Sequence, residues 1–356
     1  MRTMASEYMY WAKTRAPVRY GLSSSEVPAC RLDRFPVTIA DLELDGASRY
    51  RYPPLRAAIA RKCGVTPDHV VMADGASMAT MLAMATLIAP GDTVLVEHPV
   101  YEPMTAAALH CGADVRHFAR AEPDFRIDLD AVARLLTPKT KLIVLTNLHN
   151  PTSNRTSTET LRALGERAEA IGAKVLIDEI FLDSAIPGQT SAALLGDTFV
   201  CISSLTKCYG LSGIRCGWIL AAPDLAERMW RLNELYGVAQ AHAAEQLSLL
   251  ALDRLDEIAA DLPALLDRNR TLANAFIAGR DDLECVPMTG GITAFPRLPG
   301  GDVDMLNHVL RERFDTGIVP GRFFGSPDRF RIGIGQPTEI IEGGLERLGA
   351  ALDSLR

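Results

Sequence analysis

A chain of 356 residues, 48% hydrophobic and 23% charged, is long enough to bury more than one hydrophobic core. Its net charge of −7 comes from interspersed acidic and basic residues, and the absence of a basic run excludes the electrostatic footprint of a nucleic-acid-binding or membrane-surface protein. We therefore expect a globular protein that acts on a small molecule, with no nucleic-acid or membrane partner.

The cysteines and the N-terminal stretch indicate the cellular compartment. Seven cysteines, an odd number with no CxxC pair, favour reduced thiols over a disulfide framework and give no metal-binding spacing. The first 21 residues carry scattered charges rather than the apolar run of a signal peptide, and no stretch reaches the ~20 apolar residues of a membrane span. We expect a cytoplasmic protein without a bound metal.

Short β-branched runs alternate with longer helical patterns through the first two thirds of the chain. This alternation predicts an α/β fold built from βαβ crossovers, and runs that are apolar on both faces are typical of parallel strands between two helix layers. The expected strands are residues 69–74, 93–97, 114–118, 141–147, 174–180 and 199–204, with an apolar helix after residue 75 and another at about 157–171.

The pattern changes after Trp218. Residues 224–255 read as one or two long helices, followed by strand candidates at 290–298, 313–321 and 329–335 and a closing helix near 340–355. We expect a large α/β domain at residues 36–265 and a smaller α+β domain formed by residues 1–35 and 266–356.

Polar residues follow the predicted strands at their carboxyl ends. In parallel α/β sheets these ends share one edge, where ligands bind, so we expect the residues to converge on one crevice. They are the turn Gly75–Ala76–Ser77 together with Tyr101, Asn150, Asp178, Ser204 and Lys207. Each also has a purely structural interpretation as a turn, a packing aromatic or a helix cap. The chain has no GxGxxG or GxxxxGK motif, which argues against a dinucleotide or Walker-type nucleotide site.

Lys207 has the most specific surroundings of these residues. A desolvated lysine is a nucleophilic amine that can form a Schiff base, whereas the structural alternative is a lysine on a turn with its amine in water. Ser204, Thr206 and Arg215 add hydroxyls and a permanent positive charge, which together could cradle an anion. A Schiff-base lysine beside a phosphate cradle indicates pyridoxal phosphate.

The stretch "SSLTKCYGLSGIRCGW" resembles the lysine signature of the class I/II aminotransferases, the fold-type I pyridoxal-phosphate enzymes of the aspartate aminotransferase kind. A serine, two residues, the lysine and then an arginine eight positions later form the match. Further motifs follow in family order: "YRYPPLRAAIA", "DGAS", "HPVYEP", "NLHNPTSN", "LIDEIF", "GGITAFPRL" and "RFRIGIG". The resemblance implies a large domain with a mostly parallel seven-stranded sheet, pyridoxal 5'-phosphate as cofactor, and a homodimer with shared active sites.

The resemblance also implies a role for each site residue. Lys207 is expected to form the internal aldimine and to shuttle the substrate proton, while Asp178 pairs with the pyridine nitrogen and Tyr101 stacks on the ring. Asn150 is expected to donate to the ring oxygen O3' and, with Arg331, to bind the substrate. The expected phosphate ligands are Gly75, Ala76, Ser77, Ser204, Arg215 and, from the neighbouring subunit, Tyr52 or, as a substitute, Tyr50.

Two positions depart from the family pattern. Phe181 stands where many relatives have a tyrosine that assists Asn150 at O3', so we expect a higher aldimine pKa than in those relatives. Ser153 replaces a common glycine in "NPTSN" and is expected to restrict that turn.

The reaction expected from the resemblance is transfer of the amino group of an α-amino acid to a 2-oxo acid. A carbon–sulfur lyase or an amino-acid cyclase on the same scaffold stays open as an alternative, because one set of site residues supports several outcomes. A non-catalytic regulator is the third possibility, although no DNA-binding extension precedes the fold. The stretch "RYGLSSSEVPA", residues 19–29, is expected to contribute to the substrate pocket.

Overall fold

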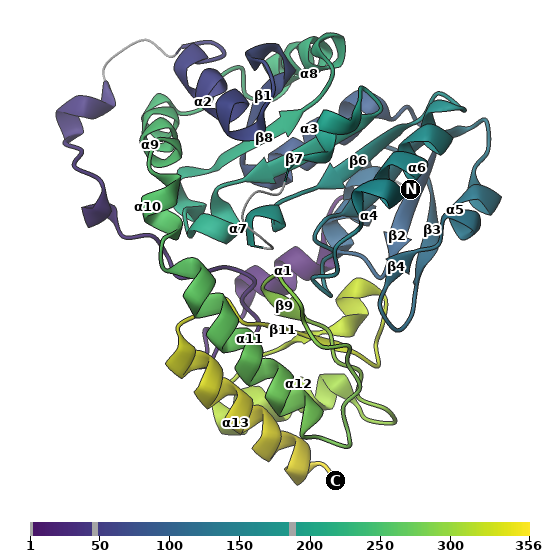
Figure 1. Cartoon of the computed structure of the whole chain (residues 1–356), viewed down its shortest axis with the longest axis vertical. Coiled ribbons are helices and arrows are strands. Elements are labelled where there is room, and N and C mark those ends of the chain that lie inside the picture. The colour runs from purple at the N-terminus through teal and green to yellow at the C-terminus, as the bar shows by residue number, and fades with distance from the viewer. Residues whose placement is uncertain (1–2, 45–48, 185–189) are drawn as a thin grey trace.

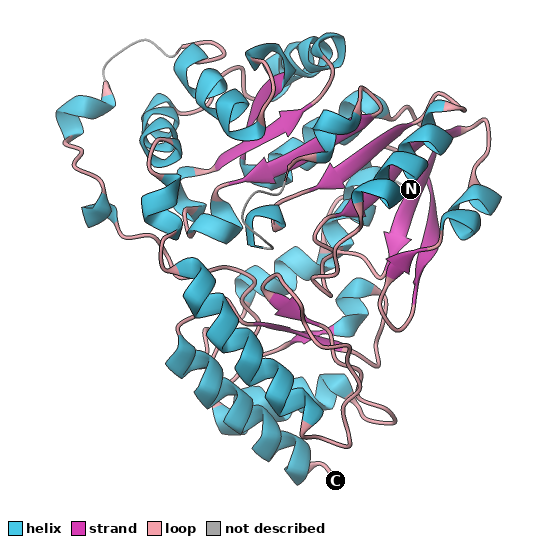
Figure 2. Ribbon diagram, in the orientation of Figure 1, coloured by secondary structure: helices cyan, strands magenta, loops and turns pink. Residues whose placement is uncertain are grey.

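The computed structural model describes residues 3–44, 49–184 and 190–356, which form two sheets with helices packed around them (Figure 1; Figure 2). The larger sheet has eight strands in the order β1-β8-β7-β6-β5-β2-β3-β4, and the smaller has three in the order β10-β11-β9. The strands are β1 Val70–Asp74, β2 Thr93–His98, β3 Asp114–Ala121, β4 Arg126–Ile127, β5 Thr140–Thr146, β6 Lys174–Asp178, β7 Phe199–Ser204, β8 Cys216–Leu220, β9 Thr293–Ala294, β10 Val319–Pro320 and β11 Phe330–Gly333.

Helices fill most of the connections between these strands. They are α1 Glu7–Thr14, α2 Pro53–Cys63, α3 Gly75–Leu87, α4 Glu102–His110, α5 Leu129–Leu135, α6 Thr158–Glu169, α7 Thr206–Tyr209, α8 Pro223–Tyr236, α9 His242–Leu252, α10 Leu255–Ala259, α11 Leu262–Ala278, α12 Val303–Phe314 and α13 Thr338–Ser354. The α/β fold expected from the alternating pattern is confirmed.

Most strands of the larger sheet run in the same direction, so their polar carboxyl ends lie at one edge of the sheet. Strands β2, β3, β5, β6 and β7 run parallel, and β8 is antiparallel to both β7 and β1. Because β8 opposes both neighbours, β1 runs in the same direction as β7, and its carboxyl end lies at the same edge. The expected mostly parallel sheet is confirmed, but it has eight strands rather than seven. The additional strand is the two-residue β4, which is too short to produce a periodic signal.

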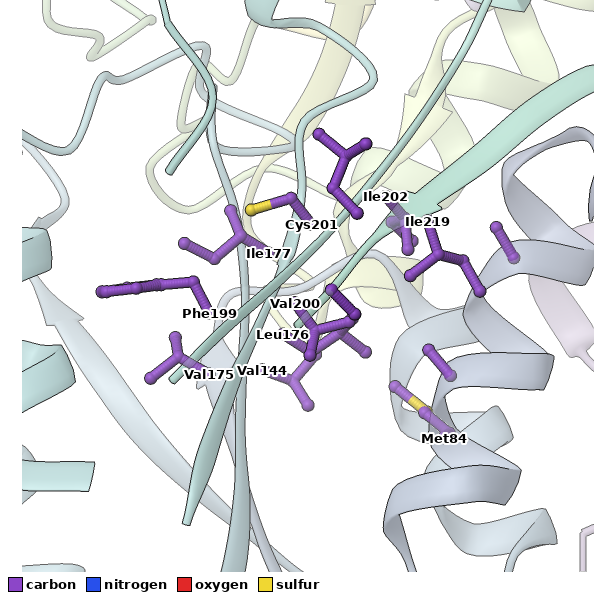
Figure 3. Close-up of a cluster of buried hydrophobic side chains, with 14 of the residues drawn as sticks. Met84, Val144, Val175, Leu176, Ile177, Phe199, Val200, Cys201, Ile202 and Ile219 are labelled. Atoms are coloured by element: carbon purple, nitrogen blue, oxygen red, sulfur yellow. The ribbon is translucent and has the colours of Figure 1, made fainter. Parts of the chain in front are cut away.

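The central strands of this sheet are buried on both faces. Ile177, Val200, Ile202 and Ile219 have no exposed surface, and Figure 3 shows them packed with neighbouring aliphatic side chains and with Met84 of α3. Continuous burial along a strand requires a layer of structure on each side of the sheet, as β-branched runs in parallel sheets predict. This core fixes the strand ends that carry the site.

A second hydrophobic core lies between the three-stranded sheet and helices α11, α12 and α13, in the lower half of Figure 1. Leu22, from the N-terminal segment, is fully buried in it. The strands β9, β10 and β11 fall within the three predicted segments. The division into domains at residues 36 and 265 stays a prediction, and the burial of Leu22 supports assigning the N-terminal residues to the smaller domain.

The N-terminal segment connects the two cores. The amide of Gly333 in β11 donates to the carbonyl of Leu22 (2.7 Å), whereas the amide of Val27 donates to the carbonyl of Lys207 (3.1 Å). The amide of Cys30 continues this contact by donating to the carbonyl of Gly210 (3.0 Å). Helix α1 lies where the two parts of the molecule meet (Figure 1). Residues 22–30 therefore line the junction.

The seven cysteines, all within the described ranges, form no disulfide bond. Among the helices in the described ranges, none has the length and apolar composition needed to cross a membrane.

Candidate active site

The amino end of α3 forms an anion cradle with the β7–β8 hairpin. Helix α3 begins at Gly75 without a side-chain cap, so its first amide groups are left for another acceptor. A Cβ on Gly75 would lie 2.3 Å from Nη2 of Arg215, and one on Gly217 would lie 2.4 Å from the Gly75 carbonyl carbon. Gly217 is thus required for the close approach of the two backbones, and Gly75, with a positive φ of 75°, leaves room for the Arg215 guanidinium. Ser204 pairs in register with Gly217, so the end of β7, Arg215 and the first amides of α3 lie near one another.

Arg215 is held in place by the backbone around this cradle. Its Nη2 donates to the carbonyl of Asp74 (3.1 Å) and its Nη1 to the carbonyl of Ser212 (3.2 Å). Neither contact neutralises the guanidinium charge. The cradle therefore presents a positive charge, backbone amides and a hydroxyl, which is the donor set that a phosphate group needs.

Asp178 ends β6 as a buried carboxylate with few partners. Its Oδ1 accepts a hydrogen bond from the amide of Ile180 (2.9 Å), and the described residues place no cation within ion-pair distance of it. Burial raises the pKa of Asp178 to about 7. A buried carboxylate in this state fits a cationic N–H donor such as a protonated pyridine nitrogen.

Lys207 lies in the short helix α7, directly after β7, and is paired with a residue that the sequence did not single out. Its Nζ lies 2.6 Å from Oε1 of Glu26, and the two side chains keep 24% and 33% of their surface exposed. The amine is therefore partly solvated and neutralised by a carboxylate, rather than desolvated as expected. The segment 19–29 was expected at the pocket, but no pattern identified Glu26 within it, because the pairing spans 181 residues of sequence.

Arg331 is a buried guanidinium without a carboxylate partner among the described residues. Its Nη1 donates to Oδ1 of Asn150 (2.9 Å), and its Nη2 to the Tyr8 hydroxyl (3.1 Å) and the Ser23 carbonyl (3.3 Å). Its Nε is buried and has no acceptor. The side chain is 1% exposed, so its charge is held away from water in a site that an incoming carboxylate could complete. Tyr8 was not predicted from the sequence.

Tyr101 caps the first turn of α4 and faces the same site. Its ring meets the Tyr8 ring edge to face, with centroids 5.2 Å apart, and its hydroxyl donates to Sδ of Met9 (3.2 Å). Burial and the neighbouring Tyr8 raise the pKa of Tyr101 well above the usual value, so the phenol stays neutral. Tyr101, Tyr8, Glu26 and Lys207 line one cavity of about 410 Å³.

A buried network behind the site holds Asn150 in position. Glu97 accepts from Nε of Arg120 (2.7 Å) and from both the amide and the hydroxyl of Thr146 (2.7 Å each). Thr146 Oγ1 in turn accepts from the amide of Asn150 (2.8 Å). Since Asn150 also contacts Arg331, the ion pair at Glu97 supports both residues of the expected substrate-binding pair.

The two departures from the family pattern have distinct surroundings. Phe181 is 4% exposed and packs with Leu148, Leu266 and Ile292, in an apolar cluster. Ser153 has a positive φ of 59°, which glycine would adopt at lower cost. The Ser153 hydroxyl lies 2.9 Å from Oγ1 of Thr293 and accepts from the Thr293 amide (3.0 Å). Ser153 therefore joins the turn after β5 to strand β9 as well as restricting it.

The two tyrosines expected at a partner subunit's phosphate make contacts within their own chain. The Tyr52 ring lies edge-on to His242, with centroids 4.9 Å apart, and the Tyr50 hydroxyl donates to Oε1 of Glu234 (2.6 Å). Their contribution to a neighbouring site stays a prediction.

Taken together, the cradle, Asp178, Lys207 and Tyr101 fit pyridoxal phosphate by their donor chemistry. The phosphate would be held by the α3 amides, Ser204 and Arg215, and the ring nitrogen by Asp178. Among the described residues, no group of three or more cysteine, histidine or acidic side chains is placed to bind a metal ion.

The chain as a whole is similar to known proteins. The family model described as aminotransferase class I and II matches residues 39–348. The capreomycidine synthase of Streptomyces vinaceus is 32% identical over 84% of this chain and 78% of its own length. The histidinol-phosphate aminotransferase of Methanocella arvoryzae is 29% identical over 71% of this chain and 67% of its own. Among solved structures, the pyridoxal-phosphate-dependent cyclase OrfR superposes with a TM-score of 0.88 at 28% identity, covering 98% of this chain and 96% of that one.

Proposed function

Because the chain belongs to the class I and II aminotransferase family, whose enzymes depend on pyridoxal phosphate, we propose that it transfers the amino group of an α-amino acid to a 2-oxo acid. The observation that carries the proposal is the buried Arg331, whose Nε lacks an acceptor and whose charge lacks a described counter-ion. A guanidinium in this state suits the α-carboxylate that both substrates share. The carbonyl of Ser23 accepts a hydrogen bond from Arg331, and Glu26, three residues later, pairs with Lys207. The same short segment therefore contacts both Arg331 and Lys207.

The residues of the chain divide the chemistry between them. When bound, pyridoxal phosphate supplies an electron sink that makes the Cα–H of an amino acid acidic. Arg331 orients the substrate by its carboxylate, and Tyr8 and Asn150 hold the guanidinium in place. Nζ of Lys207 accepts the Cα proton, and the carboxylate of Glu26 stabilises the ammonium that results. For amino transfer, Nζ of Lys207 must then release this proton to an atom other than the Cα from which it came.

Cyclisation of an amino acid is the second candidate. Two relatives reported above are named a capreomycidine synthase and a cyclase, and the cyclase covers nearly the whole chain. The same proton abstraction at Cα would start either reaction. In cyclisation the electron pair left at Cα would expel a leaving group from the neighbouring side-chain carbon, a nucleophilic side-chain atom would then add to that carbon and lose its proton, and Cα would be reprotonated, so the amino group stays on the product.

An assay with a panel of amino acids, each with and without 2-oxoglutarate, tests the two candidates. Formation of glutamate supports amino transfer. A product that forms without 2-oxoglutarate and keeps its amino group supports cyclisation, whereas pyruvate and ammonia would indicate elimination. Lys207→Ala is the control and should abolish each product. Borohydride reduction followed by peptide mapping should place the cofactor on Lys207, and trapping at any other lysine would contradict the site.

The proposed enzyme acts as a homodimer in the cytoplasm. Cysteines that form no disulfide among the described residues agree with a reducing compartment, and the family expectation of shared sites supports the dimer. Both statements stay predictions, and the subunit-mixing experiment in the Discussion tests the dimer.

A further inference from the structure

Arg120, near the end of β3, is a buried guanidinium with partners in three other segments. Its Nε donates to Oε2 of Glu97 on β2 (2.7 Å), and the two side chains are 1% and 0% exposed. Its Nη2 donates to the carbonyl of Thr146 (3.3 Å) and its Nη1 to the carbonyl of Phe125 (3.0 Å). A buried ion pair contributes little net stability, because the cost of desolvating two charges offsets most of their attraction. From Thr146 and from Phe125, separate sets of contacts lead to Arg331.

The first route runs through the end of β5. Oε1 of Glu97 accepts from the hydroxyl of Thr146 (2.7 Å), and the same hydroxyl oxygen accepts from the amide of Asn150 (2.8 Å). Oδ1 of Asn150 accepts from Nη1 of Arg331 (2.9 Å). Because Arg120 also holds the carbonyl of Thr146, the buried pair fixes both the backbone and the side chain of this threonine. The residue that contacts Arg331 is therefore tied to a fixed acceptor.

The second route runs through the β3–β4 hairpin. Phe125 lies in its turn, 6% exposed and with a positive φ of 53°, and its carbonyl accepts from Arg120. The guanidinium carbon of Arg329 lies 5.0 Å from the centroid of the Phe125 ring, and its Nη2 pairs with Oε2 of Glu122 (2.9 Å). Arg329 directly precedes β11 and lies two residues before Arg331. A hairpin of the larger sheet thus holds the amino end of the strand that carries Arg331.

The two routes end at neighbouring points of one strand in the smaller sheet. Asn150 contacts the guanidinium of Arg331, and the hairpin contacts Arg329, so the larger sheet holds β11 at two places. Arg120 contacts the first residue of each route through a different Nη group. This arrangement requires the fork of a guanidinium, because a lysine carries a single amine.

We propose that Arg120 is a positioning residue for Arg331, and that it fixes where β11 presents the Arg331 guanidinium to the α-carboxylate of the substrate. The proposal rests on the proposed function in taking Arg331 as the carboxylate site. Since its side chain is buried, Arg120 acts through these contacts and not by touching the substrate.

Binding of pentanoate and of pentanamide to the pyridoxal-phosphate-loaded protein, measured by ligand-observed NMR, tests the proposal. The two probes differ in charge at one end, so the ratio of their dissociation constants reports how well Arg331 receives a carboxylate. The wild type should prefer pentanoate about 30-fold, and Arg331→Gln should abolish the preference. Arg120→Lys keeps a charge beside Glu97 but cannot hold both carbonyls, and it should reduce the preference about fivefold or more. Arg116→Lys, on the same strand with a side chain 47% exposed, is the matched control and should leave it unchanged.

Two further variants break one route each and keep the proposal testable if Arg120→Lys does not fold. Thr146→Val removes the hydroxyl of the first route at nearly constant volume and should lower the preference, whereas Thr146→Ser keeps the hydroxyl and should retain it. Glu122→Gln, at a side chain 57% exposed, removes the charge paired with Arg329 and should lower the preference about threefold. An unchanged preference in both Thr146→Val and Glu122→Gln would overturn the proposal.

A purely structural role for Arg120 predicts a different pattern. Arg120→Lys would then lower the free energy of unfolding in urea while the folded protein kept the wild-type preference, and this result would overturn the proposal. Under the proposal, Thr146→Val should also raise the pH midpoint of the cofactor's absorbance change, because Asn150 is expected to donate to the ring oxygen O3'. Glu122→Gln should leave that midpoint unchanged.

The same binding data separate this proposal from the proposed function. If no amino acid yields glutamate but the preference for pentanoate still depends on Arg120, amino transfer fails and the positioning role stands. If glutamate forms and the preference is the same in every variant of the two routes, the positioning role fails and amino transfer stands. A wild type without any preference for pentanoate would overturn both.

Discussion

Asp178 is a buried carboxyl group, and its burial disfavours the negative charge that it would carry in water at neutral pH. Its carboxyl is 6% exposed, and its pKa rises from 3.8 to about 7 in the folded, cofactor-free protein. Between these pH values the folded chain keeps a proton that the unfolded chain has lost, so stability falls as pH rises. Glu179, buried beside it with a pKa raised to about 7, acts in the same direction.

We expect Asp178→Asn to stabilise the cofactor-free protein at pH 8, by up to on the order of 3 kcal/mol, and to have little effect at pH 4. The asparagine has no charge to desolvate, and the remaining pH dependence should come from Glu179. Urea unfolding at both pH values measures the difference. The same variant should bind pyridoxal phosphate more weakly, since the pyridine nitrogen loses its counter-ion. Identical pH dependence in variant and wild type would contradict this account.

Replacing Phe181 with tyrosine should change the pH at which the absorbance of the cofactor changes. Its ring lies among Leu148, Leu266 and Ile292, so it offers no hydrogen bond to the cofactor. In Phe181→Tyr, a hydroxyl that reaches the ring oxygen would favour the anionic oxygen, lowering the pH midpoint of the cofactor's absorbance change by about one unit. Spectrophotometric titration measures this midpoint, and Phe181→Leu serves as a control that adds no donor. Equal midpoints in Phe181→Tyr and wild type would rule the explanation out.

Among the elements, α1 was the one whose importance the sequence did not reveal. Strands β5, β6 and β7 could be predicted because each is a continuous apolar run, and their polar ends followed from the sheet rule. Helix α1 has eight residues, too few for a stable isolated helix, and its stabilising contacts come from distant positions. Tyr8 contacts Arg331, and the Ser6 hydroxyl donates to Glu102 of α4. Contacts across such sequence separations leave no local pattern.

Ser6 should control the docking of α1. Its side chain caps the helix by accepting from the Met9 amide (3.1 Å) and also contacts Glu102, so Ser6→Ala removes both interactions. We expect a loss of about 1 kcal/mol in the local stability of residues 7–14, seen as faster amide hydrogen exchange there. Thr14→Ala, which removes an exposed hydroxyl at the other end of α1, is the matched control. Uniform faster exchange across the chain would instead indicate a global effect.

At the scale of the whole molecule, a single copy leaves large apolar side chains exposed. Leu235 and Tyr236 at the end of α8 are 81% and 50% exposed, and Val238 is 55% exposed. Tyr50 contacts Glu234 in the same region. An apolar surface of this kind next to the tyrosines of the expected shared site agrees with a homodimer.

Mixing two inactive variants tests the shared site. Lys207→Ala lacks the catalytic amine, and Tyr52→Phe lacks the hydroxyl expected to reach the partner's phosphate. In a hybrid dimer, one of the two sites would contain both Lys207 and Tyr52, so activity should return when the variants exchange subunits. Light scattering should give twice the monomer mass for the wild type. A monomer, or no recovery on mixing despite exchange, would contradict the prediction.

Part of the site could not be predicted from the sequence, because it depends on how distant segments of the chain pack together. The family motifs placed the cradle, Asp178 and Arg331, because each motif is local. The Lys207–Glu26 pair and the hydrogen bond from Arg311 to the Ala16 carbonyl depend on how the N-terminal segment crosses both cores, which no local spacing encodes. The cavity beside Lys207 is therefore the least predictable part of the proposed site.

The N-terminal segment has a mechanical consequence as well. Leu22 is fastened by its carbonyl to β11 of one core, and Val27 is fastened by its amide to Lys207 of the other. Between these anchors the segment keeps contact with the smaller core, because Arg331 donates to the Ser23 carbonyl (3.3 Å) and Nε2 of Gln336 donates to the Glu26 carbonyl (2.7 Å). Residues 23–26 also line the cavity, and one of them is the partner of the lysine. The wall of the cavity beside Lys207 is therefore built on contacts to both cores, so a change in the angle between the cores would alter the shape of this cavity.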